Sequence, residues 1–143
     1  MNRSVVDASL VLKWYLADEE FGEISLRLLQ RYLDNEIELL APTLLEYEIL
    51  NALVFAQRKG RIEPESISLA LEGFYDLGME SAPAANLFPR ILFFCQTYKC
   101  SAYDSSYLAL AEAEGIDLIT ADRKLFATVK ADLKWVKWIG DMA

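Results

Sequence analysis

The sequence predicts an α/β fold whose centre is a parallel β-sheet. Three observations support this prediction: short apolar segments, longer segments of helical periodicity between them, and a composition with 54% hydrophobic and 25% charged residues. A chain of 143 residues is long enough for one hydrophobic core. Because no linker, repeat or low-complexity tract divides the chain, we expect one domain over residues 1–143.

The predicted strands are short apolar runs. One ends at Val6, directly before Asp7, and another is closed by Pro42. Because the strands alternate with helices, their carboxyl ends should share one edge of the sheet, where ligands bind in folds of this type. The predicted strands are Arg3–Val6, Ile37–Leu40, Asp117–Thr120 and a final segment within Leu133–Ile139.

Helical periodicity covers most of the remaining chain. Gly60 and Gly115 are placed to end two helices, since glycine readily adopts the left-handed conformation found just after a helix. Pro64 suits the first turn of a helix, and Pro89 is expected either in a first turn or at a kink. The predicted helices are Ala8–Leu16, Ile24–Asn35, Thr43–Lys59, Pro64–Leu77, Ala84–Tyr98, Ser101–Glu114 and a short helix from Arg123.

The chain contains no histidine. This absence excludes Ser-His-Asp and Cys-His catalytic systems, as well as imidazole-driven cleavage of RNA through the 2′-hydroxyl. Hydrolysis would have to use carboxylates, lysine, tyrosine or a metal. The GxxxxGK[ST] loop of many nucleotide hydrolases is also missing, so that class of activity is not expected.

The net charge of the chain is −8, from 22 acidic and 14 basic residues. A protein that coats nucleic acid through charge alone should be basic, so this class of protein is excluded. An acidic chain can still cut nucleic acid if bound cations reverse the charge of its active centre. The same charge suits a basic protein partner.

The sequence predicts a protein of the cytoplasm with no membrane association. No uncharged apolar stretch reaches the roughly 18 residues that a membrane span needs, and the apolar run before Asp7 is too short for a signal peptide. Cys95 and Cys100 fit neither a zinc site nor a disulfide framework, which indicates a reducing compartment.

Two acidic residues follow predicted strands. Asp7 comes directly after Val6, and Asp122 comes two residues after Thr120. Each could simply cap the helix that it precedes, because aspartate is a favoured N-cap residue. In a parallel sheet, however, both would lie at the same edge.

Two further acids, Glu48 and Asp104, lie among apolar residues of predicted helices. A carboxylate inside an apolar stripe costs several kcal/mol unless it is paired or bound to a metal. A structural hydrogen bond would explain either residue alone, whereas the four acids together, without a local Lys or Arg for each, favour a shared cation. The apolar neighbours are Leu45, Ala52 and Phe55 for Glu48, and Tyr107, Leu108 and Ala111 for Asp104.

Four carboxylates form a ligand set that suits Mg²⁺ or Mn²⁺, which prefer oxygen ligands and water to sulfur or imidazole. Such an ion lowers the pKa of a bound water, orients it and stabilises negative charge on a phosphate. An all-acid site therefore indicates hydrolysis of phosphate esters.

Several segments of the chain are similar to the PIN-domain ribonucleases, and among them to the VapC-type toxins of bacterial and archaeal toxin–antitoxin pairs. The similarity covers nearly the whole chain and is least clear from Ile62 to Phe93. Ser105-Ser106 stands where alanine is common in the family, and none of the acids is lost. The similar segments are Val5–Ser9, Pro42 with Glu48–Leu53, Ala102–Ala111 and Leu118–Leu125.

This resemblance implies a PIN-like three-layer α/β/α sandwich with a central parallel sheet of about five strands. It implies Mg²⁺ or Mn²⁺ held by Asp7, Glu48, Asp104 and Asp122, and endonucleolytic cleavage of an RNA substrate by metal-activated water. It also implies a cognate antitoxin that covers the site, and a toxin homodimer. The positions that match residues near the acids or supporting them are Ser9, Asn51 and Thr120.

Three basic residues near the acids in sequence, Lys13, Arg123 and Lys124, could contact a phosphate of the substrate. Ordinary solvated charges are the alternative for each of them.

Other functions stay open at this point. A PIN-fold nuclease could process RNA without a toxin role. A phosphatase or phospho-acceptor could use Asp7 as a nucleophile, although Ser9 stands where a haloacid-dehalogenase-type site needs a second aspartate. A non-catalytic binding module with the same fold is disfavoured because all four acids are present.

Overall fold

A five-stranded parallel sheet forms the centre of the fold, which the computed structural model describes over residues 2–142. The strand order is β3-β2-β1-β4-β5, so β1 lies in the middle, and every pair of neighbouring strands is parallel. The predicted α/β class and the five strands are confirmed. The strands are β1 (Asn2–Val6), β2 (Ile37–Pro42), β3 (Glu80–Ala82), β4 (Asp117–Thr120) and β5 (Val136–Trp138).

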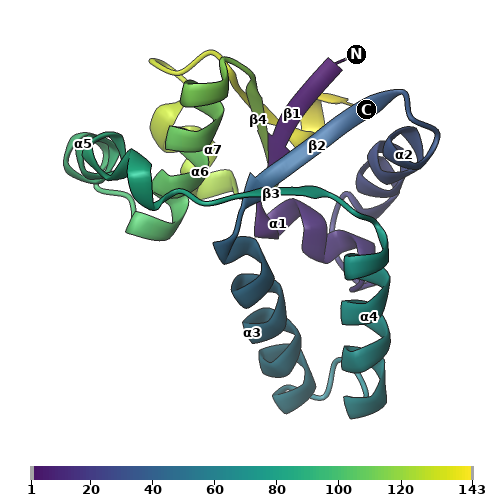
Figure 1. Cartoon of the computed structure of the whole chain (residues 1–143). Coiled ribbons are helices and arrows are strands. Elements are labelled where there is room, and N and C mark those ends of the chain that lie inside the picture. The colour runs from purple at the N-terminus through teal and green to yellow at the C-terminus, as the bar shows by residue number, and fades with distance from the viewer. Residues whose placement is uncertain (1, 143) are drawn as a thin grey trace.

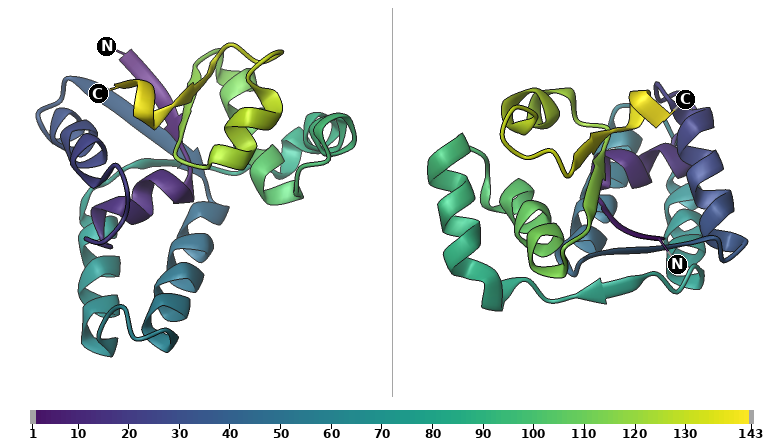
Figure 2. Two further views of the ribbon diagram at one scale, coloured as in Figure 1. Left: turned by 180° about the vertical axis from the view of Figure 1, so that it is seen from behind. Right: turned by 90° about the horizontal axis from the view of Figure 1, so that it is seen from above.

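Helices cover both faces of the sheet, as the three-layer prediction requires (Figures 1 and 2). On one face, α6 (Ala102–Glu114) packs across β1, β2 and β4, and α5 (Phe88–Tyr98) packs on the outside of α6. On the other face, α1 (Ala8–Val11) contacts β4, and α2 (Gly22–Leu33) contacts β2. The short α7 (Arg123–Val129) packs on β4 and β5 at the edge of the sheet.

Two longer helices extend away from the sheet. Figure 1 shows α3 (Leu44–Arg58) and α4 (Pro64–Asp76) side by side, and the two helices contact each other. The buried stripe of α3 consists of Leu45, Ile49 and Leu53, followed by Ala56. This stripe turns the first half of α3 toward the carboxyl edge of the sheet, where α3 also contacts α1 and β2.

The hydrophobic core lies on both faces of the sheet. The strand residues Val5, Val6 and Leu118 are fully buried, as expected for a parallel sheet that helices cover on both sides. In α6, every residue from Ser105 to Ala111 is buried, because this helix lies between the sheet and α5. The core therefore fixes α6, and with it Asp104 in the first turn of that helix.

The strand order places a topological switch point between β1 and β4. The chain passes from β1 to β2 on one side, whereas β4 and β5 lie on the other. Val6 pairs with Ile119, so the residues that follow β1 and β4 leave the sheet side by side. Ligands of open α/β sheets bind at such a point, beyond the carboxyl ends of the strands.

Most predicted elements are confirmed, with differences at their ends. The predicted helix Ala8–Leu16 is wrong in its second half: α1 ends at Val11 and a 3₁₀ turn over Leu12–Trp14 follows. Likewise, the predicted helix Ala84–Tyr98 begins with a separate 3₁₀ turn, Ala85–Leu87, and Pro89 lies in the first turn of α5, where its missing N–H costs no hydrogen bond. Gly60 and Gly115 follow their helices with φ of 75° and 66°, the left-handed conformation expected of them.

β3 has no counterpart among the strands predicted from the sequence. This strand has three residues, Glu80–Ala82, none of them fully buried, and it pairs with β2 at the edge of the sheet. A last 3₁₀ turn, Ile139–Met142, follows β5. Across the described part of the chain, no helix is both long and apolar enough to cross a membrane.

Candidate active site

The four predicted acids line one cavity of about 410 Å³ at the carboxyl edge of the sheet. They come from four separate elements: Asp7 follows β1, Asp122 follows β4, Glu48 lies in α3, and Asp104 lies in α6. The other residues lining the cavity are Ala8, Ser9, Leu12, Asn51, Ala52, Phe55 and Tyr107.

Asp7 is the most enclosed of the four acids, with 5% of its surface exposed. One carboxylate oxygen accepts hydrogen bonds from the Ser9 hydroxyl at 2.6 Å and from the backbone N–H of Leu10 at 3.2 Å. The other accepts a hydrogen bond from the Thr120 hydroxyl. Both carboxylate oxygens are therefore held in place, and the N-cap interpretation is correct alongside any role in the site.

The hydroxyls of Ser9 and Thr120 also tie the strand ends together. The Ser9 hydroxyl accepts a hydrogen bond from the N–H of Ala121 at 3.1 Å, and the Thr120 hydroxyl accepts one from the N–H of Asp122 at 3.0 Å. Because each hydroxyl donates to Asp7 and accepts from the backbone after β4, the two residues fix Asp7 relative to Asp122.

Asp122 and Asp104 each lie at the beginning of a helix. The Asp122 carboxylate accepts a hydrogen bond from the N–H of Leu125 at 3.0 Å and caps α7, so the N-cap alternative is again correct. Asp104 lies in the first turn of α6, where its N–H donates to the Ser101 hydroxyl at 3.0 Å. Its helix neighbours Tyr107 and Leu108 are buried, as the predicted apolar stripe requires, while Asp104 itself is half-buried.

Glu48 lies at the margin of the buried stripe of α3, not inside it. The predicted stripe of Leu45, Ala52 and Phe55 is correct for Leu45, which is buried, but wrong for Phe55, which is 58% exposed, and Ala52 is only half-buried. Leu45 shares the buried stripe with Ile49 and Leu53 instead. Glu48 is half-buried and faces the cavity, where its carboxylate accepts a hydrogen bond from the Tyr107 hydroxyl at 2.6 Å.

Tyr107 lines the cavity but is not among the predicted site residues. It is 1% exposed and links α6 to α3 through its hydrogen bond to Glu48. A signal was present in the sequence: Tyr107 lies three residues after Asp104 on the same helix face, and a buried tyrosine hydroxyl usually requires a polar partner.

Burial and mutual repulsion raise the pKa values of three of the acids. Burial raises the pKa of Asp7 to about 6 despite its hydrogen bonds from Ser9 and Thr120, and the charge of Asp122 adds to the rise. The pKa of Asp104 is raised by burial and by Asp122. The pKa of Glu48 is raised by burial and by Asp104, with the Tyr107 hydrogen bond acting in the opposite direction. Each of these carboxylates is thus disfavoured as an anion by burial and by a neighbouring acid.

The donor set fits a hard divalent cation, because oxygen ligands and excess negative charge are what Mg²⁺ and Mn²⁺ require. Within residues 2–142, however, no three Asp, Glu or Cys side chains converge closely enough to hold one ion. The acids therefore surround the cavity without forming a closed cage. Mg²⁺ commonly binds through one or two carboxylates together with water and substrate phosphate, and this arrangement leaves room for both.

The other predicted site residues differ in their distance from the acids. Asn51 lines the cavity with its side chain exposed, and it makes no hydrogen bond to the acids in the described part of the chain. Lys124 follows Asp122 by two residues, and its positive charge lowers the pKa of the Asp104 carboxyl and partly opposes the effect of Asp122. Of the predicted cations, it is the one whose charge acts on an acid of the cavity.

Arg123 and Lys13 do not line the acidic cavity. The Arg123 guanidinium donates to Glu20 at 2.8 Å and lies over the rings of Phe21 and Trp138. Lys13 is 8% exposed and does not line the acidic cavity. These positions do not favour the phosphate contacts that were predicted for Arg123 and Lys13.

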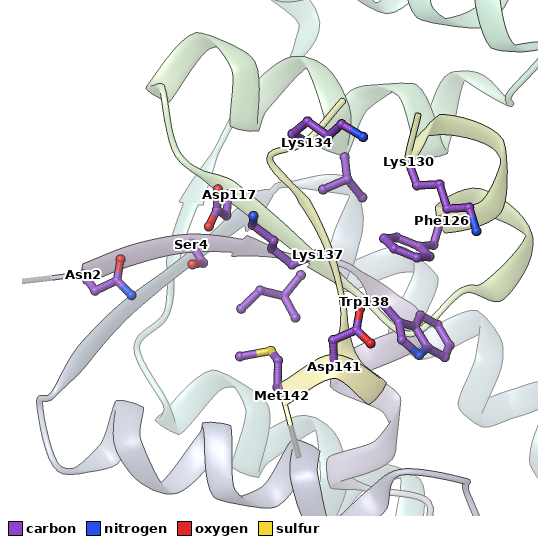
Figure 3. A pocket seen from close by; sticks show the side chains of 12 residues that line it. Asn2, Ser4, Asp117, Phe126, Lys130, Lys134, Lys137, Trp138, Asp141 and Met142 are labelled. Carbon is purple, nitrogen blue, oxygen red and sulfur yellow. The ribbon is translucent and has the colours of Figure 1, made fainter. Parts of the chain in front are cut away.

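A separate cavity of about 480 Å³ is lined by residues of β1, β4 and β5 (Figure 3). Its lining includes three lysines, Lys130, Lys134 and Lys137, together with the rings of Phe126 and Trp138. None of the four predicted acids lines it. The acidic cavity is therefore distinguished from it by charge as well as by position.

Comparison with known proteins identifies the family of this chain. The model of the PIN domain matches residues 4–131. Ribonuclease VapC9 from Mycobacterium tuberculosis is 34% identical over 127 residues, which cover 89% of this chain and 91% of the relative. Ribonuclease VapC3 from Pyrobaculum aerophilum is 28% identical over 123 residues, which cover 85% and 90% of the two chains.

Solved structures share the fold. The crystal structure of PAE2754 from Pyrobaculum aerophilum matches with a TM-score of 0.74 at 23% identity, over 99% of this chain and 86% of the other. VapC20 from Mycobacterium tuberculosis, described as a toxin that cleaves the sarcin-ricin loop, matches with a TM-score of 0.64 at 13% identity, over 87% and 93% of the two chains. The match to the domain model over residues 4–131, with the VapC9 relationship, shows that this chain belongs to the PIN domain family.

Proposed function

We propose that this chain is a divalent-metal-dependent endoribonuclease and the toxin of a toxin–antitoxin pair. The observation that carries the proposal is the gathering of Asp7, Glu48, Asp104 and Asp122 around one cavity, with the pKa raised for three of them. Such a concentration of negative charge is stabilised by a bound cation. The names of the relatives, ribonucleases VapC9 and VapC3, support RNA as the substrate.

We propose Mg²⁺ or Mn²⁺ as the ion, held by carboxylates among these four acids and by water. When bound, it would supply Lewis-acid stabilisation of the phosphate and a water of lowered pKa. The protein contributes fixed ligands: Ser9 and Thr120 hold both oxygens of Asp7, and Tyr107 holds Glu48. Fixed ligands reduce the reorganisation needed when charge develops on the phosphate.

Lys124 is the cation that we propose for contact with the substrate. It follows Asp122 by two residues, its charge lowers the pKa of Asp104, and it is exposed and forms no ion pair in the described residues. A phosphate of RNA brought to the cavity would meet this ammonium group.

The alternative in which Asp7 acts as a phosphatase nucleophile is disfavoured by its surroundings. Both carboxylate oxygens already accept hydrogen bonds, and the side chain is 5% exposed. A nucleophilic carboxylate needs an oxygen that is free to approach the phosphorus, and neither oxygen of Asp7 is free in this way. RNA processing without a toxin role uses the same site and stays the second candidate.

An antitoxin and a second copy of the chain are the proposed protein partners. The net charge of −8 suits a basic antitoxin segment over the acidic cavity, and a related fold occurs in a toxin–antitoxin complex from Klebsiella pneumoniae with a TM-score of 0.56 at 17% identity, over 87% of this chain and 90% of the other. A homodimer stays a prediction, as does a cytoplasmic location.

Purified protein tests the proposed activity directly. Incubated with total RNA and Mn²⁺ or Mg²⁺, it should release discrete fragments, stop when EDTA is added, and resume when the ion is restored in excess. Growth arrest on expression, relieved by the product of a small neighbouring open reading frame, would support the toxin role. Cleavage that continues in EDTA would contradict metal dependence, and cleavage without growth arrest would favour RNA processing.

A further inference from the structure

Two tyrosines beside the acidic cavity are unusually exposed. Of the seven tyrosines in the chain, Tyr47 and Tyr103 are the most exposed, with 75% and 64% of their surface accessible. By contrast, Tyr107 is buried and hydrogen-bonded, and Tyr32 donates its hydroxyl to the carbonyl of Leu77. Within residues 2–142, neither Tyr47 nor Tyr103 forms a side-chain hydrogen bond or an aromatic pair.

These two tyrosines lie on different helices but line one cavity. Tyr47 belongs to α3 and Tyr103 to α6, and the cavity between them measures about 620 Å³. Its remaining lining residues are Glu48, Leu50, Asn51 and Val54. The fold therefore brings together two exposed rings that are 56 positions apart in the sequence (103 minus 47).

The tyrosine cavity adjoins the acidic cavity directly. Glu48 and Asn51 line both cavities, so an RNA strand bound at the acids needs to pass only these two residues to reach the rings. Tyr47 also precedes Glu48 in the sequence, and Tyr103 precedes Asp104. Each ring is thus positioned by the same helix turn that positions an acid of the site.

The charge of the molecule limits how it can hold RNA. With a net charge of −8 and four acids at the site, phosphate contacts and counterion release supply little binding energy. Base stacking on aromatic rings does not depend on charge and favours unpaired nucleotides, because only an unstacked base offers a free face. Leu50 and Val54 add apolar surface to the same cavity, which suits the flat face of a base.

We infer that Tyr47 and Tyr103 form a base-stacking subsite that holds an unpaired nucleotide of the RNA next to the bond that is cut. This inference rests on the proposed ribonuclease function and adds two substrate-binding residues to it, on α3 and α6 beside the acidic cavity. The ring face does the binding, and the hydroxyl is not required.

Kinetics on a short single-stranded RNA that spans a mapped cleavage position test the subsite. Tyr47→Ala and Tyr103→Ala should each raise KM by roughly 5- to 150-fold, the range expected for loss of one base stack, with a much smaller change in kcat. Tyr47→Phe and Tyr103→Phe should retain nearly the KM of the unaltered protein, because phenylalanine offers the same ring face. Circular dichroism checks that each variant is folded.

Two controls separate stacking from other effects. Tyr75→Ala removes a tyrosine of α4 that is 59% exposed but lies outside both cavities, and it should leave KM unchanged. For the unaltered protein, KM should be higher for an RNA that lacks the base on one side of the cleavage position than for the intact RNA. On that abasic RNA, the corresponding alanine variant should show no further loss.

Each outcome decides between the possible roles. Unchanged KM in both alanine variants, or a loss in the phenylalanine variants as large as in the alanine variants, would overturn the stacking subsite while leaving the ribonuclease intact. Unchanged cleavage with weaker neutralisation by antitoxin would assign the rings to the protein partner and also overturn it. No cleavage by the unaltered protein would contradict the proposed function and this inference together.

Discussion

Asp7 combines deep burial with a carboxylate that the function requires to be charged. It is 5% exposed, and burial raises its pKa to about 6, even though three hydrogen-bond donors contact it. The proposed cation would offset this cost when it binds. Without metal, Asp7 should destabilise the folded state at every pH at which its carboxyl is ionised.

Metal-free protein should become more stable as the pH falls from 7 to about 5. The pKa of Asp7 is about 6 in the folded state and 3.8 in a free carboxyl, so the folded state binds the proton more tightly. The free energy of unfolding gained on acidification is then lost as the pH rises through about 6. Its size is roughly 1.4 kcal/mol for each unit by which the folded-state pKa of Asp7 exceeds the unfolded-state pKa. Urea unfolding in EDTA at a series of pH values measures this change.

Asp7→Asn is the matched control for that titration. The variant should be at least as stable as the unaltered protein at pH 7 without metal, and its stability should vary less between pH 5 and 7. Identical pH profiles for the two proteins would show that Asp7 does not carry the cost assigned to it.

Tyr107 controls the position of Glu48 through one hydrogen bond of 2.6 Å. Tyr107→Phe keeps the buried ring but removes the hydroxyl, and a hydrogen bond to a charged group contributes about 1.5–3 kcal/mol. We expect RNA cleavage to fall by roughly tenfold or more and the Mn²⁺ concentration for half-maximal activity to rise. Tyr98→Phe, which removes an exposed hydrogen bond to Asp132, serves as the control and should change neither quantity.

At the level of single residues, the sequence was most informative where the backbone decides the position. Asp7 and Asp122 could be placed because each follows a strand of a parallel sheet. The placement of Glu48 was correct only in part, because the rotation of α3 depends on its packing against α1 and β2, which periodicity alone does not determine. Tyr107 was missed because its partner lies 59 positions away.

At the level of elements, α6 is the helix on which the site most depends. It lies between the sheet and α5, and seven consecutive residues from Ser105 to Ala111 are buried. Its first turn carries Asp104, and its second carries Tyr107. Loosening α6 would therefore displace two parts of the site at once.

Leu108→Ala should destabilise the protein by about 2–5 kcal/mol, because it leaves a cavity in a fully buried position of α6. Leu92→Ala makes the same change in α5, where the side chain is 51% exposed, and should cost far less. Urea unfolding of the two variants measures the difference. Equal losses would contradict the central position assigned to α6.

Strong periodicity and capping residues made most helices predictable, whereas β3 was not. β3 has the sequence Glu-Ser-Ala, is largely exposed and exists because its backbone pairs with β2. Its side chains carry no alternation that would mark a strand. For the same reason, the change from α-helix to 3₁₀ turn after Val11 depends on the packing of neighbouring segments.

At the level of the whole molecule, the charge is opposite to that of a protein that binds RNA through its phosphates. The net charge of −8 and the acidic cavity are compatible with RNA cleavage only if cations and uncharged contacts supply the binding. The predicted fold class and charge therefore constrain the mechanism more strongly than they constrain the identity of the RNA.

The KM for a short RNA should accordingly depend only weakly on monovalent salt at fixed Mn²⁺. Each phosphate neutralised by Lys or Arg on a single strand contributes a slope of about −0.7 in log affinity against log salt. We expect a slope that corresponds to about one or two such contacts. In Lys124→Ala, the slope should become shallower by the amount that one contact contributes. A steep slope that survives in Lys124→Ala would show that basic residues elsewhere hold the RNA.

The most direct test of the central claim is the Mn²⁺-dependent rate of RNA cleavage by Asp7→Asn and Asp104→Asn, compared with Glu46→Gln. Glu46 is an acid of the same α3 that carries Glu48, but it lies outside the acidic cavity. The two aspartate variants should stay folded and lose roughly 10²-fold or more in rate, because ligand charge at the ion is removed, whereas Glu46→Gln should keep the full rate. Folded Asp7→Asn and Asp104→Asn proteins that still cleave RNA at the unaltered rate would contradict the four-acid site.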